Sequence, residues 1–342
     1  MRAMAIREHG GPEVLRLEDL PDPPPGPGDI LVRVRACALN HLDLWTRRGL
    51  PGRPLTMPHV LGNDIAGEVV ETGAGVEDMP RGLRVMLSPG VSCGRCRPCL
   101  AGEDNACRRY RILGHQIHGG YAELVRCPVV NAIPLPDGFS FEETAAFPLV
   151  FLTAWHMLAI KARLRPGEDV LVWGAGSGVG MAAIQVAKVL GGRVIASAGS
   201  DSKLELARQL GADAVVNHYA ADVVAEVKGL TGKKGADVVI EHVGEATWER
   251  SILALAHGGR LVTCGATTGP RGTTDLRYLF SKQLSLLGSY MGSKAELLDV
   301  AALFFARKLR SVVHAVLPLS EARRAHEMME ASQHFGKIVL QV

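Results

Sequence analysis

A glycine-rich turn between an apolar strand and an apolar helix constrains this chain most strongly. Residues 169–180 read D-V-L-V-W-G-A-G-S-G-V-G, and residues 170–173 have the β-branched and aromatic composition of a buried parallel strand. Residues 181–190 read as an alanine-rich helix that stops at two glycines. Glycines let the backbone approach a diphosphate, and the N–H groups at the positive helix end favour its charge. The stretch predicts a dinucleotide site.

The same glycines allow a second interpretation, because a tight strand–helix turn without a ligand needs glycine too. The spacing also departs from the G-x-G-x-x-G fingerprint, since Val179 stands where the last glycine belongs. The surrounding pattern favours the dinucleotide. Apolar strands are expected at 192–197, 214–216, 236–241, 260–264 and 285–288, with helices at 203–210 and 223–230. This alternation predicts an α/β fold with a doubly wound parallel sheet.

Short strands with glycine and proline breaks come before this region. We expect them at 3–6, 13–17, 30–38, 67–71 and 84–87, with a proline-rich loop at 21–27. They predict a compact, barrel-like β domain. The final segment, 337–342, reads K-I-V-L-Q-V and is a strand too late for the strand–helix series. We therefore expect the C-terminus to return to the first domain.

Composition narrows the class of protein. A chain of 342 residues should form about two domains with ample core. Charged residues make up 21%, the net charge is +3 and no long basic run occurs, so neither a nucleic acid nor a membrane is an expected partner. The apolar stretch 170–190 is broken by glycines and carries Gln185 and Lys188, unlike a membrane span. The N-terminus has charges where a signal peptide needs an apolar core, which predicts a cytoplasmic protein.

Four of the seven cysteines form a cluster that reads C-G-R-C-R-P-C-L-A-G-E-D-N-A-C: Cys93, Cys96, Cys99 and Cys107. Two-residue gaps let successive thiolates face one centre, and the longer gap lets the chain turn back to close a tetrahedron. Four thiolates predict one structural Zn²⁺ per chain. An iron–sulfur cluster is the chemical competitor, and disulfides are the remaining alternative, disfavoured in a reducing compartment. The other cysteines, 37, 127 and 264, lie in apolar runs and are expected in the core.

Together these motifs resemble the medium-chain dehydrogenase/reductase superfamily, which includes zinc alcohol dehydrogenases and quinone reductases. The resemblance spans nearly the whole chain and also rests on A-C-A-L-N-H-L-D at 36–43, P-H-V-L-G-N-D-I-A-G at 58–67 and F-G-K-I-V-L at 335–340. It implies a GroES-like catalytic domain at 1–151 and 292–342, with a zinc lobe at 90–110. A dinucleotide-binding Rossmann domain at 152–291 would lie between these segments, with the active site in the cleft. The lobe cysteines match the structural zinc ligands of the superfamily.

The catalytic zinc ligands of the superfamily are missing from the matching positions. Zinc alcohol dehydrogenases carry a cysteine ligand and, two residues later, a hydroxyl that relays a proton; here these positions hold Asn40 and Leu42. The G-H-E ligand segment reads Gly-Asn-Asp at 62–64, and the third ligand should fall near Leu149. Amides are poor zinc ligands beside thiolate and imidazole. The resemblance therefore implies a reductase that kept the structural zinc and lost the catalytic one.

Without a Lewis acid, hydride delivery to a simple ketone lacks charge stabilisation. A quinone or an α,β-unsaturated carbonyl spreads its own negative charge, so we predict NAD(P)H-dependent reduction of a quinone or an activated C=C bond. Asn40 and Asn63 would donate hydrogen bonds to the acceptor oxygen, with Asp43 orienting them and Asp64 beside them. Each asparagine could instead cap a loop.

Two other functions stay open. The first is a zinc alcohol dehydrogenase with a rearranged metal site that uses Asp64, His59 or His41. The second is a non-catalytic NADPH-binding protein. His59, His115 and His118 are alternative proton donors.

Cofactor choice is predicted by the residues after the second strand of the central domain. NAD enzymes usually have an acid there, whereas this chain has Ala-Gly-Ser at 198–200, followed by Asp201, Ser202 and Lys203. Hydroxyls and a lysine suit a 2′-phosphate, so NADPH is preferred, with NADH possible and Asp201 a potential helix N-cap. We expect a homodimer or homotetramer. The expected cofactor contacts are His41, which matches a superfamily position near the diphosphate, and Thr153, Gly174, Gly176, Ser177, Gly178, Val179, Ser200, Lys203, Val243, Gly265 and Lys337.

Overall fold

A computed structural model describes residues 1–50, 52 and 54–342 of the chain. It divides into two compact units. The first comprises Met1–Leu149, Ser293–Phe305 and Arg310–Val342, and the second comprises Val150–Gly292 and Ala306–Leu309. The sequence-based division put 1–151 and 292–342 in the first domain, whereas residues 150–151, Gly292 and Ala306–Leu309 group with the second unit.

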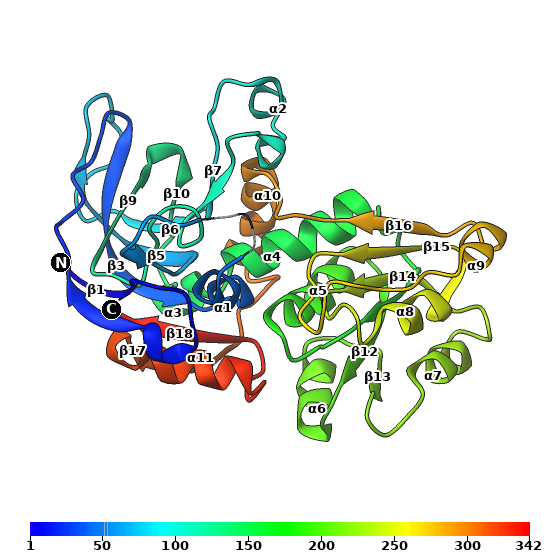
Figure 1. Ribbon diagram of the computed structural model, residues 1–342. Coiled ribbons are helices and arrows are strands. Elements are labelled where there is room, and N and C mark those ends of the chain that lie inside the picture. The colour runs from blue at the N-terminus through cyan, green and yellow to red at the C-terminus, as the bar shows by residue number, and fades with distance from the viewer. Residues whose placement is uncertain (51, 53) are drawn as a thin grey trace. The chain divides into compact units, whose positions relative to one another are not determined.

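The first unit is built on two sheets whose strand pairs are antiparallel, except that β17 and β18 pair parallel (Figure 1). The larger has the order β10-β6-β5-β3-β18-β17, with β9 also paired to β3, and the smaller has the order β2-β1-β4. The strands are β1 (Arg2–Ile6), β2 (Arg16–Asp19), β3 (Asp29–Ala38), β4 (His59–Val60), β5 (Asp64–Thr72), β6 (Arg84–Leu87), β9 (Leu124–Pro128), β10 (Ala132–Pro134), β17 (Val313–Pro318) and β18 (Lys337–Gln341). A separate pair, β7 (Gly90–Val91) and β8 (Arg111–Ile112), flanks the cysteine lobe.

Helices and turns complete the first unit. The helices are α1 (His41–Arg48), α2 (Arg97–Leu100), α3 (Phe141–Ala145), α10 (Lys294–Phe305) and α11 (Ala322–Glu330), and the 3₁₀ turns are Pro12–Val14, Asp104–Ala106, Val129–Asn131 and Leu319–Glu321. The C-terminal strand β18 pairs antiparallel with β3, which confirms that the chain returns to the first domain.

One predicted strand of this unit was wrong. Residues 13–17 were expected to be a single strand, but Pro12–Val14 is a 3₁₀ turn and β2 starts only at Arg16. Proline fixes its own φ near the helical value and favours the first position of a helical turn. The turn therefore takes the residues that the apolar pattern assigned to the strand.

The second unit contains a six-stranded sheet whose order is β13-β12-β11-β14-β15-β16, with every pair parallel. This is the order 3-2-1-4-5-6 of a doubly wound nucleotide-binding sheet, which confirms the predicted fold class. The strands are β11 (Asp169–Val172), β12 (Arg193–Ala198), β13 (Ala214–Asn217), β14 (Ala236–Glu241), β15 (Leu255–Thr263) and β16 (Ser285–Gly288). The helices are α4 (Pro148–Trp155), whose first two residues belong to the first unit, with its π-helical continuation His156–Lys161, and α5 (Gly178–Val189), α6 (Asp201–Gln209), α7 (Val223–Leu230), α8 (Trp248–Ala254) and α9 (Leu276–Ser281). The strand order reverses between β11 and β14, and ligands of such sheets bind outside the carboxyl ends of the strands at that point.

Apolar residues fill a separate core in each unit. The first unit buries residues such as Ile30, Val32, Ile65 and Leu340, and the second buries residues such as Leu171, Ile195 and Val239. Of the described residues, one helical run, Phe141–Lys161, is long and apolar enough to cross a membrane, with a mean hydropathy of 1.3. Within its most apolar window 72% of the residues are buried in the protein, as in a core helix, which passes the same test.

Candidate active site and metal centre

Three strand ends bring Asn40, Asp64 and Lys337 together in the first unit. Asn40 follows β3, Asp64 begins β5 and Lys337 begins β18, and β3 lies between the other two strands in the sheet. The Lys337 Nζ donates to Asn40 Oδ1 at 2.6 Å and to Asp64 Oδ2 at 3.0 Å. The Asn40 Nδ2 donates to the same Asp64 oxygen at 2.9 Å. The three side chains form a closed hydrogen-bonded cluster.

This cluster is buried, and its two charged side chains, Lys337 and Asp64, form an ion pair. The side chains of Lys337 and Asp64 are 2% and 0% exposed, so each would carry a large desolvation cost alone. Asp64 also accepts the backbone N–H of Leu149 at 2.8 Å through its other oxygen. An ammonium group can only donate, so Lys337 fixes the orientation of the Asn40 amide, with its oxygen toward Lys337 and its nitrogen toward Asp64.

Asp43 orients the backbone around this cluster. Its carboxylate accepts the N–H of Asn40 at 2.8 Å and that of Gly62 at 2.9 Å. Burial raises the pKa of Asp43 to about 7, against the opposing effect of these two N–H groups and of the Lys337 charge. Gly62 has φ +98°, and a Cβ there would collide with Tyr121 and Cys37. Asp43 thus joins the start of α1 to the loop before β5.

Asn63 has a different environment from Asn40. Its side chain is fully buried, and its Nδ2 donates to the Leu113 carbonyl at 2.7 Å. Its Oδ1 is one of the buried side-chain atoms in the described residues that have no hydrogen-bond partner. The sequence predicted that Asn63 would donate a hydrogen bond to the substrate. The atom without a partner is instead its oxygen, which can only accept a hydrogen bond.

The position predicted for the third metal ligand also belongs to the cluster. Leu149 contributes only its backbone N–H, to Asp64. Asp64 therefore links the positions of two expected ligands, 40 and 149, and it directly follows Asn63, the position of the remaining one. The side chains at these positions are two amides and an apolar group, which are poor zinc ligands beside thiolate and imidazole.

The candidate histidines make their hydrogen bonds elsewhere in the first unit. His59 Nε2 lies 3.4 Å from the Gly114 carbonyl, and its ring is 5.5 Å from that of His118. Burial, followed by the charge of His118, lowers the pKa of His59 to about 4. His115 Nδ1 pairs with the Thr46 hydroxyl at 2.7 Å. His41 is the first residue of α1.

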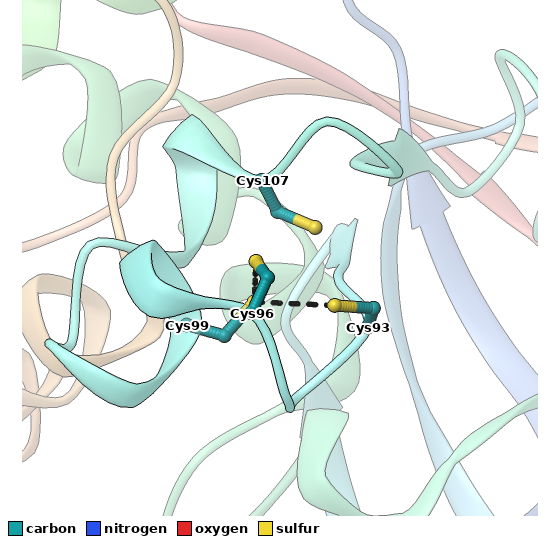
Figure 2. A group of neighbouring side chains, drawn as sticks. All are labelled: Cys93, Cys96, Cys99 and Cys107. Atoms are coloured by element: carbon teal, nitrogen blue, oxygen red, sulfur yellow. Dashed lines mark hydrogen bonds between the residues drawn. The ribbon is translucent and has the colours of Figure 1, made fainter.

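The four lobe cysteines converge on one point (Figure 2). All four Sγ atoms lie within 4.8 Å of one another, with 3.4 Å between Cys96 and Cys99 and 3.9 Å between Cys93 and Cys99. A tetrahedron with Zn–S distances of about 2.3 Å has edges of about 3.8 Å, so the spacing fits zinc. The N–H of Arg95 and that of Cys96 lower the pKa of Cys93 to about 5, which favours the thiolate. No other cluster of three or more His, Cys, Asp or Glu side chains with metal-binding spacing occurs in the described part of the chain.

The remaining cysteines are only partly as predicted. Cys37 and Cys127 are buried in β3 and β9. Cys264 was expected in the core, but it is half-buried just after β15 ends. The strand ends one residue earlier than the apolar pattern indicated, so Cys264 falls in the following loop.

The glycine turn lies between β11 and α5, at the carboxyl edge of the sheet where the strand order reverses. Ser177 caps α5 by accepting the N–H of Gly180 at 2.9 Å. Gly174 adopts φ +56°, and a Cβ on Gly180 would collide with the Gly174 carbonyl. Gly180 therefore gives the close strand–helix packing that the fingerprint assigns to its last glycine, in a turn one residue longer. Val179, Gly176 and Gly178 belong to the same turn.

The residues after β12 form the predicted adenosine end of the cofactor site. Ser200 is the N-cap of α6 and accepts the Lys203 N–H at 3.4 Å. Asp201, expected as a potential cap, is instead the first helical residue. A side chain at the N-cap points back toward the N–H groups of the first turn, and the Ser200 hydroxyl takes that place here.

Sequence reasoning missed three side chains near this end. His218 follows β13 and pairs with the Ser197 hydroxyl at 2.8 Å. Tyr219 is 85% exposed with its ring 4.6 Å from that of His218. Burial, then the charges of Arg250 and Lys203, lowers the pKa of His218. The sequence could have pointed to His218 and Tyr219, because they follow β13, whose carboxyl end lies beside that of β12 in a parallel sheet.

The other expected cofactor contacts are distributed over both units. Thr153 is buried in α4, Val243 follows β14 and Gly265 follows β15, all in the second unit. His41 and Lys337 belong to the first unit. Lys337, expected at the cofactor, has its ammonium on Asn40 and Asp64.

Comparisons with known proteins agree with this architecture. Residues 26–137 match the alcohol dehydrogenase GroES-like domain, and residues 178–306 match the zinc-binding dehydrogenase family. A quinone oxidoreductase of Rattus norvegicus is 32% identical, over 99% of this chain and 97% of its own. An NAD-dependent alcohol dehydrogenase of Sulfolobus acidocaldarius is 33% identical over the full length of both. A crystal structure described as an NAD-dependent alcohol dehydrogenase is 52% identical, with a TM-score of 0.97 over all of both chains.

This chain belongs to the medium-chain dehydrogenase/reductase superfamily. It is therefore an oxidoreductase with a GroES-like domain and a Rossmann-type domain. Enzymes of this superfamily use NAD(P) and zinc, and the cysteine lobe is compatible with the structural zinc. The relatives include proteins named for quinones and proteins named for alcohols, so membership does not choose between these substrates.

Proposed function

We propose that this enzyme uses NADPH to reduce a quinone or an activated C=C bond and has no catalytic zinc. One observation carries the proposal: Asn40, at the expected position of the first metal ligand, is held in a closed hydrogen-bonded cluster with Asp64 and Lys337. The ammonium of Lys337 already supplies a positive charge there, and neither an amide nor an ammonium is a good zinc ligand.

The cluster can stabilise negative charge on an acceptor oxygen. When bound, the reduced nicotinamide supplies the hydride to a carbon of the conjugated acceptor. The Asn40 amide nitrogen carries two hydrogens, so its bond to Asp64 leaves a second N–H for the oxygen that becomes anionic. Lys337, on the amide oxygen of Asn40, withdraws electron density and strengthens that N–H as a donor. The anion then takes a proton from solvent and becomes the reduced product.

Asp43 contributes by holding geometry. Its two backbone contacts, to Asn40 and Gly62, keep the donor amide at the start of α1 in place against the loop before β5. Preorganised donors are more effective than flexible ones, because the site does not reorganise while charge develops.

The preference for NADPH rests on the basic groups after β12 and β13. Ser200, Lys203, His218 and Arg250 would hold the 2′-phosphate, and the turn at 174–180 would hold the diphosphate. NADH remains the competing cofactor, since two of the similar proteins are named as NAD-dependent.

A zinc alcohol dehydrogenase is the second candidate function, favoured by the names of those same relatives. The two are distinguished by zinc content per chain together with NADPH oxidation against a quinone, an enone and an alcohol–aldehyde panel. We expect about one zinc and turnover of quinone or enone. Two tightly held zincs with alcohol turnover would contradict the proposal, and binding of NADPH without turnover of any acceptor would favour a non-catalytic role.

We also infer a homo-oligomer in the cytoplasm. Strand β16 is an edge of its sheet, and the neighbouring α9 exposes Leu276 and Phe280 at 68% and 71%. Unpaired edges and exposed apolar side chains favour association. None of the seven cysteines, all of them in the described part of the chain, forms a disulfide, which is consistent with a reducing compartment.

A further inference from the structure

The cysteine lobe contacts the first turn of α10 through the carboxylate of Asp104. Asp104, which lies between Cys99 and Cys107 in the sequence, accepts the backbone N–H of Lys294 at 2.8 Å and its ammonium at 2.8 Å. The first N–H groups of a helix have no partner within the helix, and a negative charge there is favourable. Asp104 therefore caps α10 and forms an ion pair with it.

Asp104 is also hydrogen-bonded to one of the four lobe cysteines, Cys107. It is 7% exposed, and its backbone carbonyl accepts the N–H of Cys107 at 3.1 Å. The Lys294 ammonium reaches Ser92, the residue before Cys93, at 3.4 Å. The lobe has little apolar core of its own, and its Leu100 is 76% exposed. Its shape thus depends on the four cysteines and whatever they bind.

The other end of α10 contacts the segment before Leu149. Phe304 lies ten residues after Lys294, about 15 Å along the helix axis. Its fully buried ring stacks on Phe147 at 4.3 Å and 21°, and also packs against Phe139 at 4.9 Å. Figure 1 shows α10 beside α2 of the lobe.

Phe147 in turn sets the position of one contact of the buried cluster. Pro148 follows it and then Leu149, whose N–H donates to Asp64. Proline restricts both its own φ and the residue before it. A shift of the Phe147 ring therefore moves the Leu149 amide, and with it one of the hydrogen bonds that hold the Asp64 carboxylate.

From this continuous path we propose that Asp104 and Phe304 are positioning residues. The lobe, held by its metal, fixes α10, and α10 fixes the Leu149 N–H on Asp64. All of these contacts lie within the first unit, and the coupling holds whichever acceptor the enzyme reduces. It predicts that the metal of the lobe stabilises the buried cluster as well as the lobe itself.

Amide hydrogen exchange on the full chain tests the coupling directly. Asp104→Ala with its zinc still bound should exchange at least tenfold faster than wild type in peptides covering 298–305 and 147–152. Wild type stripped of zinc should do the same. The matched control is Glu321→Ala, which breaks an exposed 2.8 Å ion pair to Arg324 in the same unit. Faster exchange confined to 90–110 and 294–297, or a change no larger than in the control, would overturn the proposal.

A conservative variant separates positioning from a general loss of stability. Asp104→Glu, which keeps a carboxylate that can accept from both donors of Lys294, should exchange slowly at 147–152 and should keep most of the kcat lost by Asp104→Ala, with KM for NADPH nearly constant throughout. Phe304→Leu, which leaves the lobe contacts intact, should speed exchange at 147–152 without zinc loss. Exchange at 147–152 in Phe304→Leu that is as slow as in wild type would contradict the proposed coupling from α10 to the Leu149 N–H. Loss of activity after brief chelation that leaves one zinc bound would contradict the proposed function but not the exchange result.

Discussion

The Lys337 ammonium lies 2.6 Å from the Asn40 side-chain oxygen, across 297 positions of sequence. The same ammonium reaches Asp64, so one buried cation satisfies both an amide and a carboxylate at the ends of three neighbouring strands. In the proposed mechanism this contact fixes which atom of Asn40 faces the acceptor.

Lys337→Met should destabilise the first unit strongly, because it leaves the buried Asp64 carboxylate without its cation. Removing one partner of a buried pair costs about 3–5 kcal/mol in free energy of unfolding. Adding Asp64→Asn should recover much of that loss, since no uncompensated charge then remains. Denaturant titration measures this, with Arg324→Ala at the exposed pair to Glu321 as control. A loss as small as that in the control would show that the buried pair does not stabilise the fold.

Lys203→Ala should weaken NADPH binding more than NADH binding, since only NADPH presents a 2′-phosphate to the ammonium. A loss of about 1–2 kcal/mol, roughly 5- to 30-fold in Kd, fits one charge-assisted contact. Lys228→Ala on α7 is the matched control, and equilibrium titration with both cofactors is the measurement. Equal losses for NADPH and NADH would assign Lys203 to the helix surface alone.

Cys99→Ser should release the lobe zinc and lower the Tm, because a thiolate of the closed site is lost. Cys264→Ser, outside the lobe, should keep about one zinc per chain and melt near wild type. Elemental analysis and thermal unfolding measure both effects. If Cys99→Ser retains its metal and its Tm, the four cysteines do not form the zinc site.

Acid should destabilise the protein partly through His59. Its pKa is about 4 in the folded protein and about 6.5 in the unfolded chain. Between these values the unfolded chain binds a proton that the folded protein does not, so the free energy of unfolding decreases as pH falls from 6.5 to 4. The contribution is fully present above pH 6.5 and amounts to about 3 kcal/mol at most.

His59→Gln, which keeps a donor for the Gly114 carbonyl, should flatten this part of the stability–pH curve. His314→Gln, at an exposed position of β17, is the control. An unchanged slope between pH 6.5 and 4 in His59→Gln would exclude His59 as a source of the acid sensitivity.

Local patterns predicted much of this fold. The parallel strands at 236–241 and 285–288, the helix at 223–230 and the lobe cysteines could all be read from apolar runs and spacing, because each depends on neighbouring residues. The 3₁₀ turn at Pro12–Val14 was missed because one proline outweighed the apolar pattern around it.

The site was harder to predict because its contacts join distant parts of the chain. Asn40, Asp43 and Asp64 could be selected from two short motifs, but the contact of Lys337 with Asn40 exists only once β18 pairs with β3. The orientation of the Asn40 amide follows from that contact, so sequence could not supply it. His218 and Arg250 were missed because neither belongs to a motif, and their contacts with Ser197 and Trp173 arise only in the folded second unit.

The most direct test of the account is kcat for enone reduction at saturating NADPH, for wild type and Asn40→Ala. Both should be assayed before and after brief chelation that leaves one zinc per chain. Loss of one preorganised donor should lower kcat on the order of 10²-fold, about 2.7 kcal/mol, with little change in NADPH affinity. The effect should be smaller for a quinone, and chelation should leave the wild-type rate unchanged. An unchanged rate for Asn40→Ala, or prompt loss of wild-type activity on chelation, would contradict a metal-free site built on Asn40.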